Sequence, residues 1–234
     1  MRYAWPIMSI GDNHLPFFNQ PAFDFILRLI KQIKPKIIID LGDKYDFCSF
    51  GKFPKRMRLS PYEEVELGLN MAWKNWHKIR KAAGPKCKCF QIMGNHDERP
   101  SKRLIEKLPE LDAVYELKDL WSFPGVETIK DPRDDLIIND IQFTHGHRSK
   151  IGDHLKNNNF KNVNVGHLHR GGVYFHRLDT GEIKWELNSG FIGDPFSPEL
   201  IYRPMKKYFT WTAGVGLIDE SGPRFIPFNG KEKR

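Results

Sequence analysis

With 234 residues, 40% of them hydrophobic, the chain is long enough to bury the core of one α/β domain and gives little reason to expect two domains. Its formal net charge of +8 and sequence pI near 9.3 favour a polyanionic partner, although charge alone does not distinguish nucleic acid from nonspecific adhesion. No apolar segment approaches the ~20 residues that span a bilayer, and three cysteines without a preceding signal peptide fit a cytoplasmic protein better than a secreted one.

Residues 3–10 and 36–41 are predicted to be strands, with a helix over residues 21–34 between them. The helix is indicated by apolar residues at helical spacing, with Asn19 as a cap and Pro21 in the first turn. The run Lys36 to Leu41 is β-branched and bounded by Pro35 and Gly42, which is typical of a buried strand. We expect a right-handed parallel βαβ unit.

A basic loop and a long helix are predicted next. The loop runs from Lys52 to Arg58, and Ser60-Pro-Tyr-Glu63 is a capping box that should begin the helix. Trp73 and Trp76 belong to the apolar stripe of this helix, so we expect both to be core anchors rather than platforms for stacking bases.

The rest of the chain is expected to form one more helix, an irregular connection and several strands. Cys87 and Cys89 are too close for the usual zinc-knuckle spacing and are expected to alternate on the edge of a strand. No internal repeat divides the chain, so we expect one domain over residues 1–229 and a loose tail over 230–234. The predicted elements are a strand at 86–93, a helix at 101–108, an irregular segment at 111–135 with room for one strand, and strands at 136–139, 141–144, 173–177, 183–187, 208–219 and 224–228.

Five apolar runs stop at Asp, Asn or His beside a glycine. Six of the nine histidines in the chain fall in these stretches. Such strand ends meet at one edge of an α/β sheet, where ligand sites form. The runs end at Asp12 and His14, at Asp43 and Asp46, at Asn95, His96 and Asp97, at His145 and His147, and at His167 and His169.

These residue types predict a metal site. Carboxylates, an amide oxygen and imidazoles without thiolate suit divalent ions such as Mn²⁺, Zn²⁺ or Fe²⁺. Seven such groups exceed what one ion can use. A pair of ions ~3.5–4 Å apart that shares a carboxylate both generates a hydroxide and stabilises an in-line displacement at phosphorus.

The order of the blocks is Asp-x-His, Gly-Asp-x-x-Asp, Gly-Asn-His-Asp, His-Gly-His and Gly-His-x-His. In this order they resemble the calcineurin-like metallophosphoesterase superfamily, over the chain from about Ile7 to His169. The resemblance implies an α/β fold in which two mixed β-sheets pack as a sandwich flanked by helices, with a dinuclear metal site at one edge. A short, basic chain of this kind is similar to the small phosphoesterases of phages and bacteria, and more distantly to SbcD-like nucleases.

The resemblance also implies roles for individual residues. Two divalent ions would bind, for which we favour Mn²⁺, with Fe²⁺, Zn²⁺ or Ni²⁺ as alternatives. Asp43 would bridge the ions, one of which would be held by Asp12, His14, Asp43 and His169, and the other by Asp43, Asn95, His145 and His167.

His96 would donate a proton to the leaving oxygen, as in the family. Asp46 is the expected partner that orients its ring, and Asp97 is a second candidate for that role. His147 matches a position that is often near the site, with a structural hydrogen bond as an equal alternative. The sequence offers no covalent nucleophile in these motifs, so we expect direct hydrolysis by a hydroxide that bridges the ions.

The substrate expected is a phosphodiester of nucleic acid or a nucleotide. Phe47 and Cys48 stand where the family's protein phosphatases have Arg and Gly, and Asp97 replaces Glu, which makes a protein phosphatase a poor fit. A phosphomonoesterase of nucleotides or polynucleotide ends is the alternative. It would suit the cations expected near the site, which are Lys44, Lys52, Arg99 and Arg148.

A third possibility is a non-catalytic scaffold of the same fold, against which the intact ligand set and His96 argue. If the substrate is a polynucleotide, the basic loop should help to bind it, because the loop begins just after Asp46 at the active-site edge. Its cations are Lys52, Lys55, Arg56 and Arg58. Such binding should weaken steeply with salt.

Overall fold

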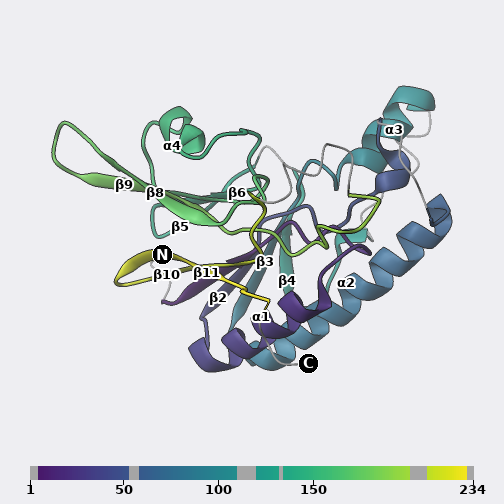
Figure 1. Cartoon of the computed structure of the whole chain (residues 1–234), viewed down its shortest axis with the longest axis horizontal. Coiled ribbons are helices and arrows are strands. Elements are labelled where there is room, and N and C mark those ends of the chain that lie inside the picture. The colour runs from purple at the N-terminus through teal and green to yellow at the C-terminus, as the bar shows by residue number, and fades with distance from the viewer. Residues whose placement is uncertain (1–4, 53–57, 110–119, 132–133, 201–209, 231–234) are drawn as a thin grey trace.

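The computed structural model describes residues 5–52, 58–109, 120–131, 134–200 and 210–230. Within them the chain forms two mixed β-sheets (Figure 1). The first has six strands in the order β11-β10-β1-β2-β3-β4, in which β1 to β4 are parallel and β10 and β11 are antiparallel to their neighbours. Its strands are β1 (Ile7–Ile10), β2 (Ile37–Asp40), β3 (Lys88–Ile92), β4 (Val126–Ile129), β10 (Gly214–Asp219) and β11 (Gly222–Pro227).

The second sheet has five strands in the order β5-β6-β7-β9-β8. β6, β7 and β9 are parallel, while β5 and β8 pair antiparallel at the two edges. Its strands are β5 (Leu136–Ile138), β6 (Ile141–Thr144), β7 (Val163–Val165), β8 (Gly172–Arg177) and β9 (Ile183–Asn188).

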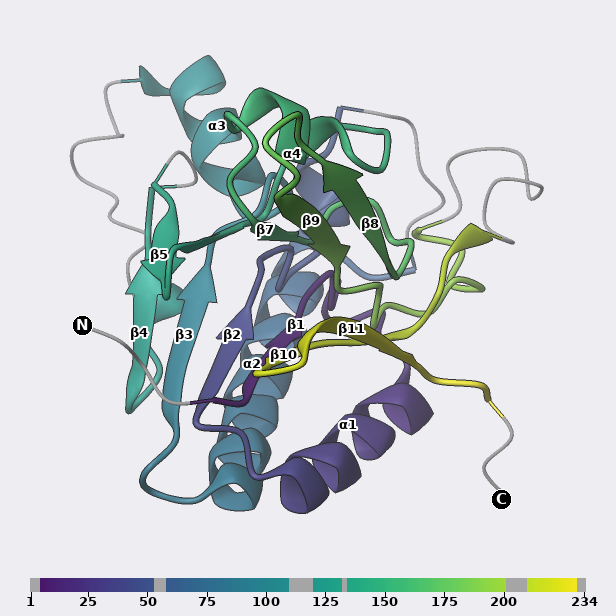
Figure 2. The ribbon, with the colours of Figure 1, turned by 90° about the vertical axis from the view of Figure 1, so that its left-hand side faces the viewer.

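Helices lie on the outer faces of this sandwich. Figure 2 shows α1 and α2 along one face of the first sheet, while α4 lies beside the second sheet. The α-helices are α1 (Gln20–Ile33), α2 (Pro61–Ala83), α3 (Arg99–Lys107) and α4 (Asp153–Asn157), and a short 3-10 helix, η1, spans Cys48–Phe50. The predicted fold class is therefore confirmed.

Side chains at alternate positions of the buried strands point to opposite faces of the first sheet and pack into two cores. Ile7 and Ile37 point into the core between the sheets, where they meet Phe143 and Leu187 of the second sheet. Their neighbours Met8 and Ile38 face the other way and pack with α1 and α2. Both faces are covered, as the near-continuous apolar runs of β1 and β2 predict.

The helix starts follow the predicted caps. The Asn19 side chain accepts a hydrogen bond from the Ala22 amide, and Ser60 and Glu63 form both halves of a capping box. α3 begins two residues earlier than predicted, and α4 was not predicted. The irregular segment 111–135 contains β4, and residues 111–119 and 132–133 of it lie outside the described residues.

Two sequence expectations about side chains are wrong. Trp73 is 47% exposed, whereas Trp76 is buried, because the buried face of α2 passes through Gly68, Ala72 and Trp76 and leaves Trp73 at its margin. Cys89 is not on a sheet edge, since β3 pairs with β2 on one side and β4 on the other.

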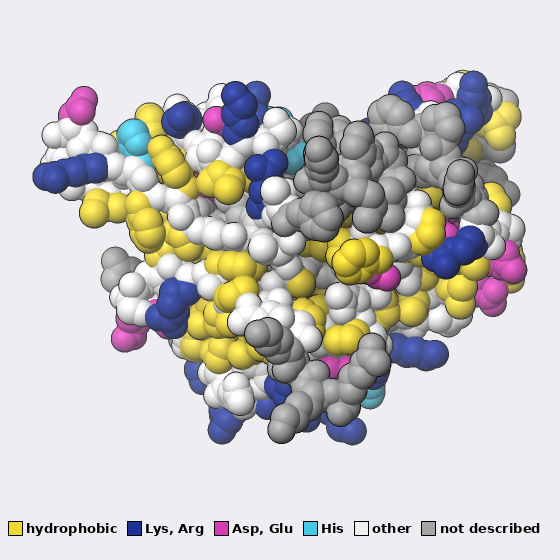
Figure 3. All heavy atoms as spheres, in the orientation of Figure 1, with side chains coloured by type: hydrophobic (Ala, Val, Ile, Leu, Met, Phe, Trp, Pro, Cys, Tyr) yellow, Lys and Arg dark blue, Asp and Glu magenta, His cyan; other side chains and the backbone are white. Residues whose placement is uncertain are grey.

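Positive side chains do not form one patch on the face of the molecule that Figure 3 shows. In the space-filling view, Lys and Arg side chains are spread over the visible surface instead of forming one patch (Figure 3). Among the described residues, no helix is both long and apolar enough to cross a membrane. A site must therefore be located from local geometry.

Candidate metal centre

The strand ends of both sheets meet at one edge of the sandwich. β1, β2 and β3 of the first sheet lead to Asp12, Asp43 and Asn95. β6 and β7 of the second sheet lead to His145 and His167. The polar residues after five strands are thus brought together, as expected for the carboxyl ends of parallel strands.

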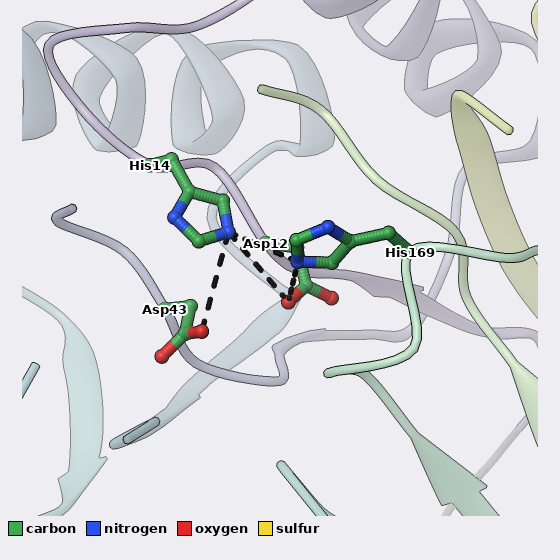
Figure 4. Close-up of side chains that lie close together, drawn as sticks. All are labelled: Asp12, His14, Asp43 and His169. Atoms are coloured by element: carbon green, nitrogen blue, oxygen red, sulfur yellow. Dashed lines mark hydrogen bonds and ion pairs between the residues drawn. The ribbon is translucent and has the colours of Figure 1, made fainter. Parts of the chain in front are cut away.

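The first group of potential ligands consists of Asp12, His14, Asp43 and His169, which are all buried (Figure 4). One ligand atom from each lies within 4.8 Å of the others. His169 Nε2 is 3.2 Å from Asp12 Oδ1 and 3.1 Å from His14 Nε2. His14 Nε2 is 4.0 Å from Asp43 Oδ2.

The second group consists of Asp43, His145 and His167, with Asn95 beside them. His145 Nε2 lies 3.3 Å from Asp43 Oδ2 and 3.1 Å from the amide oxygen of Asn95. His167 Nδ1 lies 2.8 Å from the same amide oxygen. Asp43 therefore belongs to both groups, and the structure brings together all seven residues that the sequence predicts as ligands.

Hydrogen bonds outside the two groups orient the imidazoles. His145 Nδ1 is 2.9 Å from the Leu41 carbonyl oxygen, which can only accept, so Nδ1 carries a hydrogen and Nε2 is the nitrogen that faces Asp43. His14 Nδ1 is 3.0 Å from Asp46 Oδ1, and its Nε2 likewise faces the site. A ring held through Nδ1 in this way binds a metal ion through Nε2 when Nε2 carries no proton.

The backbone at the site is unusual. Asp12, His14, Asp43, His167 and His169 all have φ between 48° and 65°, a left-handed conformation that non-glycine residues rarely adopt. Each such residue costs of order 1 kcal/mol or more and persists only where the surroundings enforce it. Such conformations are common at ligand sites, which is consistent with a site at this cluster.

Close backbone contacts leave no room for side chains at two glycines. Gly42 has φ of 98°, and a Cβ there would come within 2.6 Å of the Gly94 amide nitrogen. A Cβ on Gly94 would overlap Asp43 Oδ1. The glycines of Gly-Asp and Gly-Asn therefore let β2 and β3 approach closely enough to hold the shared carboxylate.

The electrostatics of the cluster favour bound positive charge. Burial alone would raise the pKa values of Asp12 and Asp43, but the neighbouring histidines, His169 for the first and His145 for the second, lower them below the usual range. Burial opposes a charge on His145, yet the Asp43 carboxylate raises the pKa of His145 to about 10. The carboxylates thus attract a cation strongly.

The pKa values of His14 and His167 are lowered, whereas that of His145 is raised. Burial lowers the pKa of His14 to about 4, and burial together with the charge of His145 lowers that of His167 to about 4. Both rings are therefore neutral near neutral pH. Neutral imidazoles beside ionised carboxylates form a donor set suited to divalent metal ions.

His96 is held beside the two groups. Its Nδ1 lies 2.8 Å from Asp46 Oδ1, and its Nε2 lies 3.9 Å from Asp43 Oδ2. Arg99 Nη2 is 2.8 Å from His96 Nε2, a contact that the sequence motifs did not identify. Because Arg99 has no acceptor, it donates to Nε2, and His96 donates from Nδ1 to Asp46.

Asp97 and His147 have other surroundings. The Asp97 carboxylate accepts hydrogen bonds from the backbone amides of Lys44, Tyr45 and Gly94, at 3.3, 3.0 and 2.8 Å, and so braces the loops after β2 and β3. The His147 side chain is exposed, and its amide donates to His154 Nε2 at 3.1 Å. Neither residue belongs to the two ligand groups among the described residues.

The cations expected near the site differ in availability. Lys44 is buried, forms an ion pair with Asp40 and lies 4.8 Å from the centre of a Trp76 ring, so it cannot reach a substrate. Lys52 forms an ion pair of 2.8 Å with Glu106. Arg148 is 3.4 Å from Asn157 Oδ1. Arg99 alone of these four contacts the proposed catalytic histidine.

Of the basic loop, only Lys52 and Arg58 are among the described residues. Arg58 makes two contacts of 2.8 and 2.9 Å with the buried Glu199 carboxylate, which ties it to the protein. Lys55 and Arg56 lie outside the described residues. That this loop binds a polynucleotide stays a prediction.

Known proteins were compared at the levels of sequence and fold. The sequence profile of the calcineurin-like phosphoesterase family matches residues 6–213. No curated protein is significantly similar to the chain in sequence.

Several solved structures have a similar fold at low identity. The phosphoesterase Yfce from E. coli is 20% identical with a TM-score of 0.45, over 97% of this chain and 96% of that chain. Vps29 complexed with Zn²⁺ from Entamoeba histolytica is 13% identical with a TM-score of 0.44, over 96% and 100%. The nuclease MPE of Pseudomonas putida is 16% identical with a TM-score of 0.40, over 95% and 87%.

Proposed function

Because the chain belongs to the calcineurin-like phosphoesterase family, we propose that it is a dimetal-dependent hydrolase of phosphodiesters in nucleic acid or nucleotides. The observation that carries this proposal is the position of Asp43. Its carboxylate is common to both ligand groups, which is the arrangement that two ions sharing one carboxylate require.

The donor set fits two divalent ions. Asp12, His14 and His169 would complete one site with Asp43, and Asn95, His145 and His167 would complete the other. Both sets contain oxygen and imidazole donors without thiolate, which supports Mn²⁺ with Fe²⁺, Zn²⁺ or Ni²⁺ as alternatives. When bound, such ions activate water and offset the negative charge that develops at phosphorus.

The protein's own residues supply orientation and a proton. Asp46 holds His96 through Nδ1, so that Nε2 faces the site 3.9 Å from Asp43. Once Arg99 no longer donates to it, His96 Nε2 can take up a proton from solvent, and the resulting imidazolium can deliver that proton to the leaving oxygen of a substrate. Asp46 acts as a positioning residue because it contacts His96 and not the expected substrate position.

A phosphodiester is favoured over a phosphomonoester by the residue after Asp46. Phe47, which replaces the arginine of the protein phosphatases, is buried and stacks on Tyr45 with ring centres 5.0 Å apart. No cation at this position can neutralise a dianionic monoester. Phosphomonoesterase activity is the second candidate, which the contact of Arg99 with His96 favours.

Parallel assays distinguish these functions. With Mn²⁺ added, the protein should hydrolyse bis-p-nitrophenyl phosphate faster than p-nitrophenyl phosphate, and Asp43→Asn should abolish the activity and reduce the metal content. Faster hydrolysis of the monoester would establish the second candidate. Absence of both activities in protein that contains two ions per chain would favour a scaffold.

A further inference from the structure

Arg99 occupies the space next to His96 where a substrate must enter. Its Nη2 donates to His96 Nε2 over 2.8 Å, and its Nη1 donates to the Asp46 carbonyl oxygen over 2.7 Å. His96 Nε2 is the atom that should meet the leaving oxygen. A bound substrate therefore has to take Arg99 away from this atom, and the displaced guanidinium can then bind a phosphate of the substrate.

A basic cleft continues outward from Arg99 between η1 and α3. We term it the α3 cleft; it has a volume of about 190 Å³. Four cationic side chains and one carboxylate line it among the described residues, so its charge is positive. The cleft is lined by Phe50, Lys52, Arg99, Lys102, Arg103 and Glu106.

The outer cations of the cleft can exchange their carboxylate partners for a phosphate. Lys102 is 57% exposed and forms a 2.6 Å ion pair with Glu98, while Arg103 is 51% exposed and lies 3.7 Å from Glu106. Exposed pairs of this kind contribute about 0–1 kcal/mol, so a phosphate can replace the carboxylate partner. In Figure 3, Lys and Arg side chains lie among carboxylates at the upper right, in the region of α3.

The spacing of the cations indicates more than one phosphate. Lys102 and Arg103 stand three and four residues after Arg99 in α3, so each lies one turn beyond it, with Cβ atoms about 5–6 Å from that of Arg99. Arg99 lies at the reacting end, and the adjacent Lys102 and Arg103 form a pair farther out. Cations on two successive turns match consecutive phosphates along a strand better than the single phosphate of a mononucleotide.

We propose that the α3 cleft binds a single-stranded oligonucleotide through the phosphates on the leaving-group side of the scissile bond. This inference rests on the proposed function, because the position of His96 defines the leaving-group side. Arg99 would bind the first of these phosphates, and Lys102 and Arg103 would bind those that follow.

Binding without catalysis tests the proposal. Fluorescence anisotropy with 5′-fluorescein-labelled hexathymidylate, in EDTA over a series of salt concentrations, compares the parent with Lys102→Ala/Arg103→Ala. We expect weaker binding and a plot of log K against log salt that is less steep by about 0.7 for each lost contact, or about 1.4 in total. Both substitutions are at exposed helix positions, where alanine preserves the helix.

Lys74→Ala/Lys78→Ala is the matched control, because it removes two exposed lysines from α2, outside the α3 cleft. It should bind as the parent does. If the α3 variant binds like the parent at every salt concentration, or if the control loses as much, the proposal is wrong. Binding is measured in EDTA and therefore does not depend on hydrolysis. If the protein binds the oligonucleotide through α3 but hydrolyses neither nitrophenyl ester, the proposed cleft is supported and the proposed hydrolase activity is refuted.

Discussion

Asp46 connects the metal-binding residues with the proposed proton donor. Its Oδ1 is 3.0 Å from His14 Nδ1 and 2.8 Å from His96 Nδ1, and the two rings meet edge to face with centres 4.6 Å apart. The motif Gly-Asp-x-x-Asp predicted the contact with His96. The contact with His14 could not be predicted, because it depends on how the loop after β1 crosses the loop after β2.

The role of His96 can be tested with leaving groups of different basicity. His96→Ala should lower kcat by about 10²–10⁴ on a diester with a poor leaving group, since proton transfer is then lost. With a p-nitrophenolate leaving group, which departs without protonation, the loss should be much smaller. Equal losses on the two substrates, measured by steady-state kinetics, would show that His96 binds phosphate or supports the metals instead.

The close approach of β2 and β3 predicts the effect of a methyl group at Gly94. Gly94→Ala should displace the Asp43 carboxylate, because the new Cβ would overlap its Oδ1. We therefore expect fewer bound ions per chain by elemental analysis. Gly172→Ala is the control, since a Cβ there meets no atom within 4 Å. Two ions retained in Gly94→Ala would contradict this account of the glycine.

At the scale of elements, α4 shows how a distant side chain can create a helix. Glu186 of β9 is buried and accepts hydrogen bonds from the amides of Gly152, His154 and Leu155, at 2.9, 3.0 and 3.1 Å. These amides are at the start of α4, where the residue before the helix, Gly152, provides no side-chain cap. The Glu186 carboxylate takes the place of a local cap.

This cap predicts a pH-dependent stability. Burial by itself raises the pKa of Glu186, but the His154 side chain and the amide donors outweigh it and lower the pKa from 4.5 to about 2. The contribution to the free energy of unfolding is therefore complete above about pH 4.5 and is lost as the pH falls towards 2. Glu186→Gln should cost about 1–3 kcal/mol at neutral pH, because its NH₂ group cannot accept from an amide.

Urea unfolding in EDTA measures this difference. The difference in the free energy of unfolding between the parent and Glu186→Gln should become smaller when the pH is lowered from about 6 to about 3. Glu220→Gln, at an exposed position after β10, should differ little from the parent at either pH. A difference that is constant with pH would mean that Glu186 stabilises the protein by packing and not by its charge.

Local signals explain which elements the sequence could predict. α1 and α2 carry their caps at Asn19 and Ser60, and the buried strands β1 and β2 are near-continuous apolar runs. α4 has five residues and a cap 32 residues away, so no local pattern indicates it. The exposure of Trp73 was missed for a similar reason, because it depends on which part of α2 faces the sheet.

At the scale of the whole molecule, the site depends on the packing of two sheets. Asp12, Asp43 and Asn95 follow strands of the first sheet, while His145 and His167 follow strands of the second. The side chains of Ile7, Ile39 and Phe143 in the core between the sheets fix their relative position. The motifs predicted which residues meet, but the pairing of β7 with β9 and of β1 with β10 joins distant segments and was not predictable from local sequence.

We propose above all that Asp43 binds two ions at this junction of the sheets. The most direct test of this claim is the anomalous scattering of crystals grown with Mn²⁺. We expect two peaks about 3.5–4 Å apart, one on each side of the Asp43 carboxylate, with Asp12, His14 and His169 around one and Asn95, His145 and His167 around the other. A single peak, or two peaks of which only one contacts Asp43, would contradict the claim.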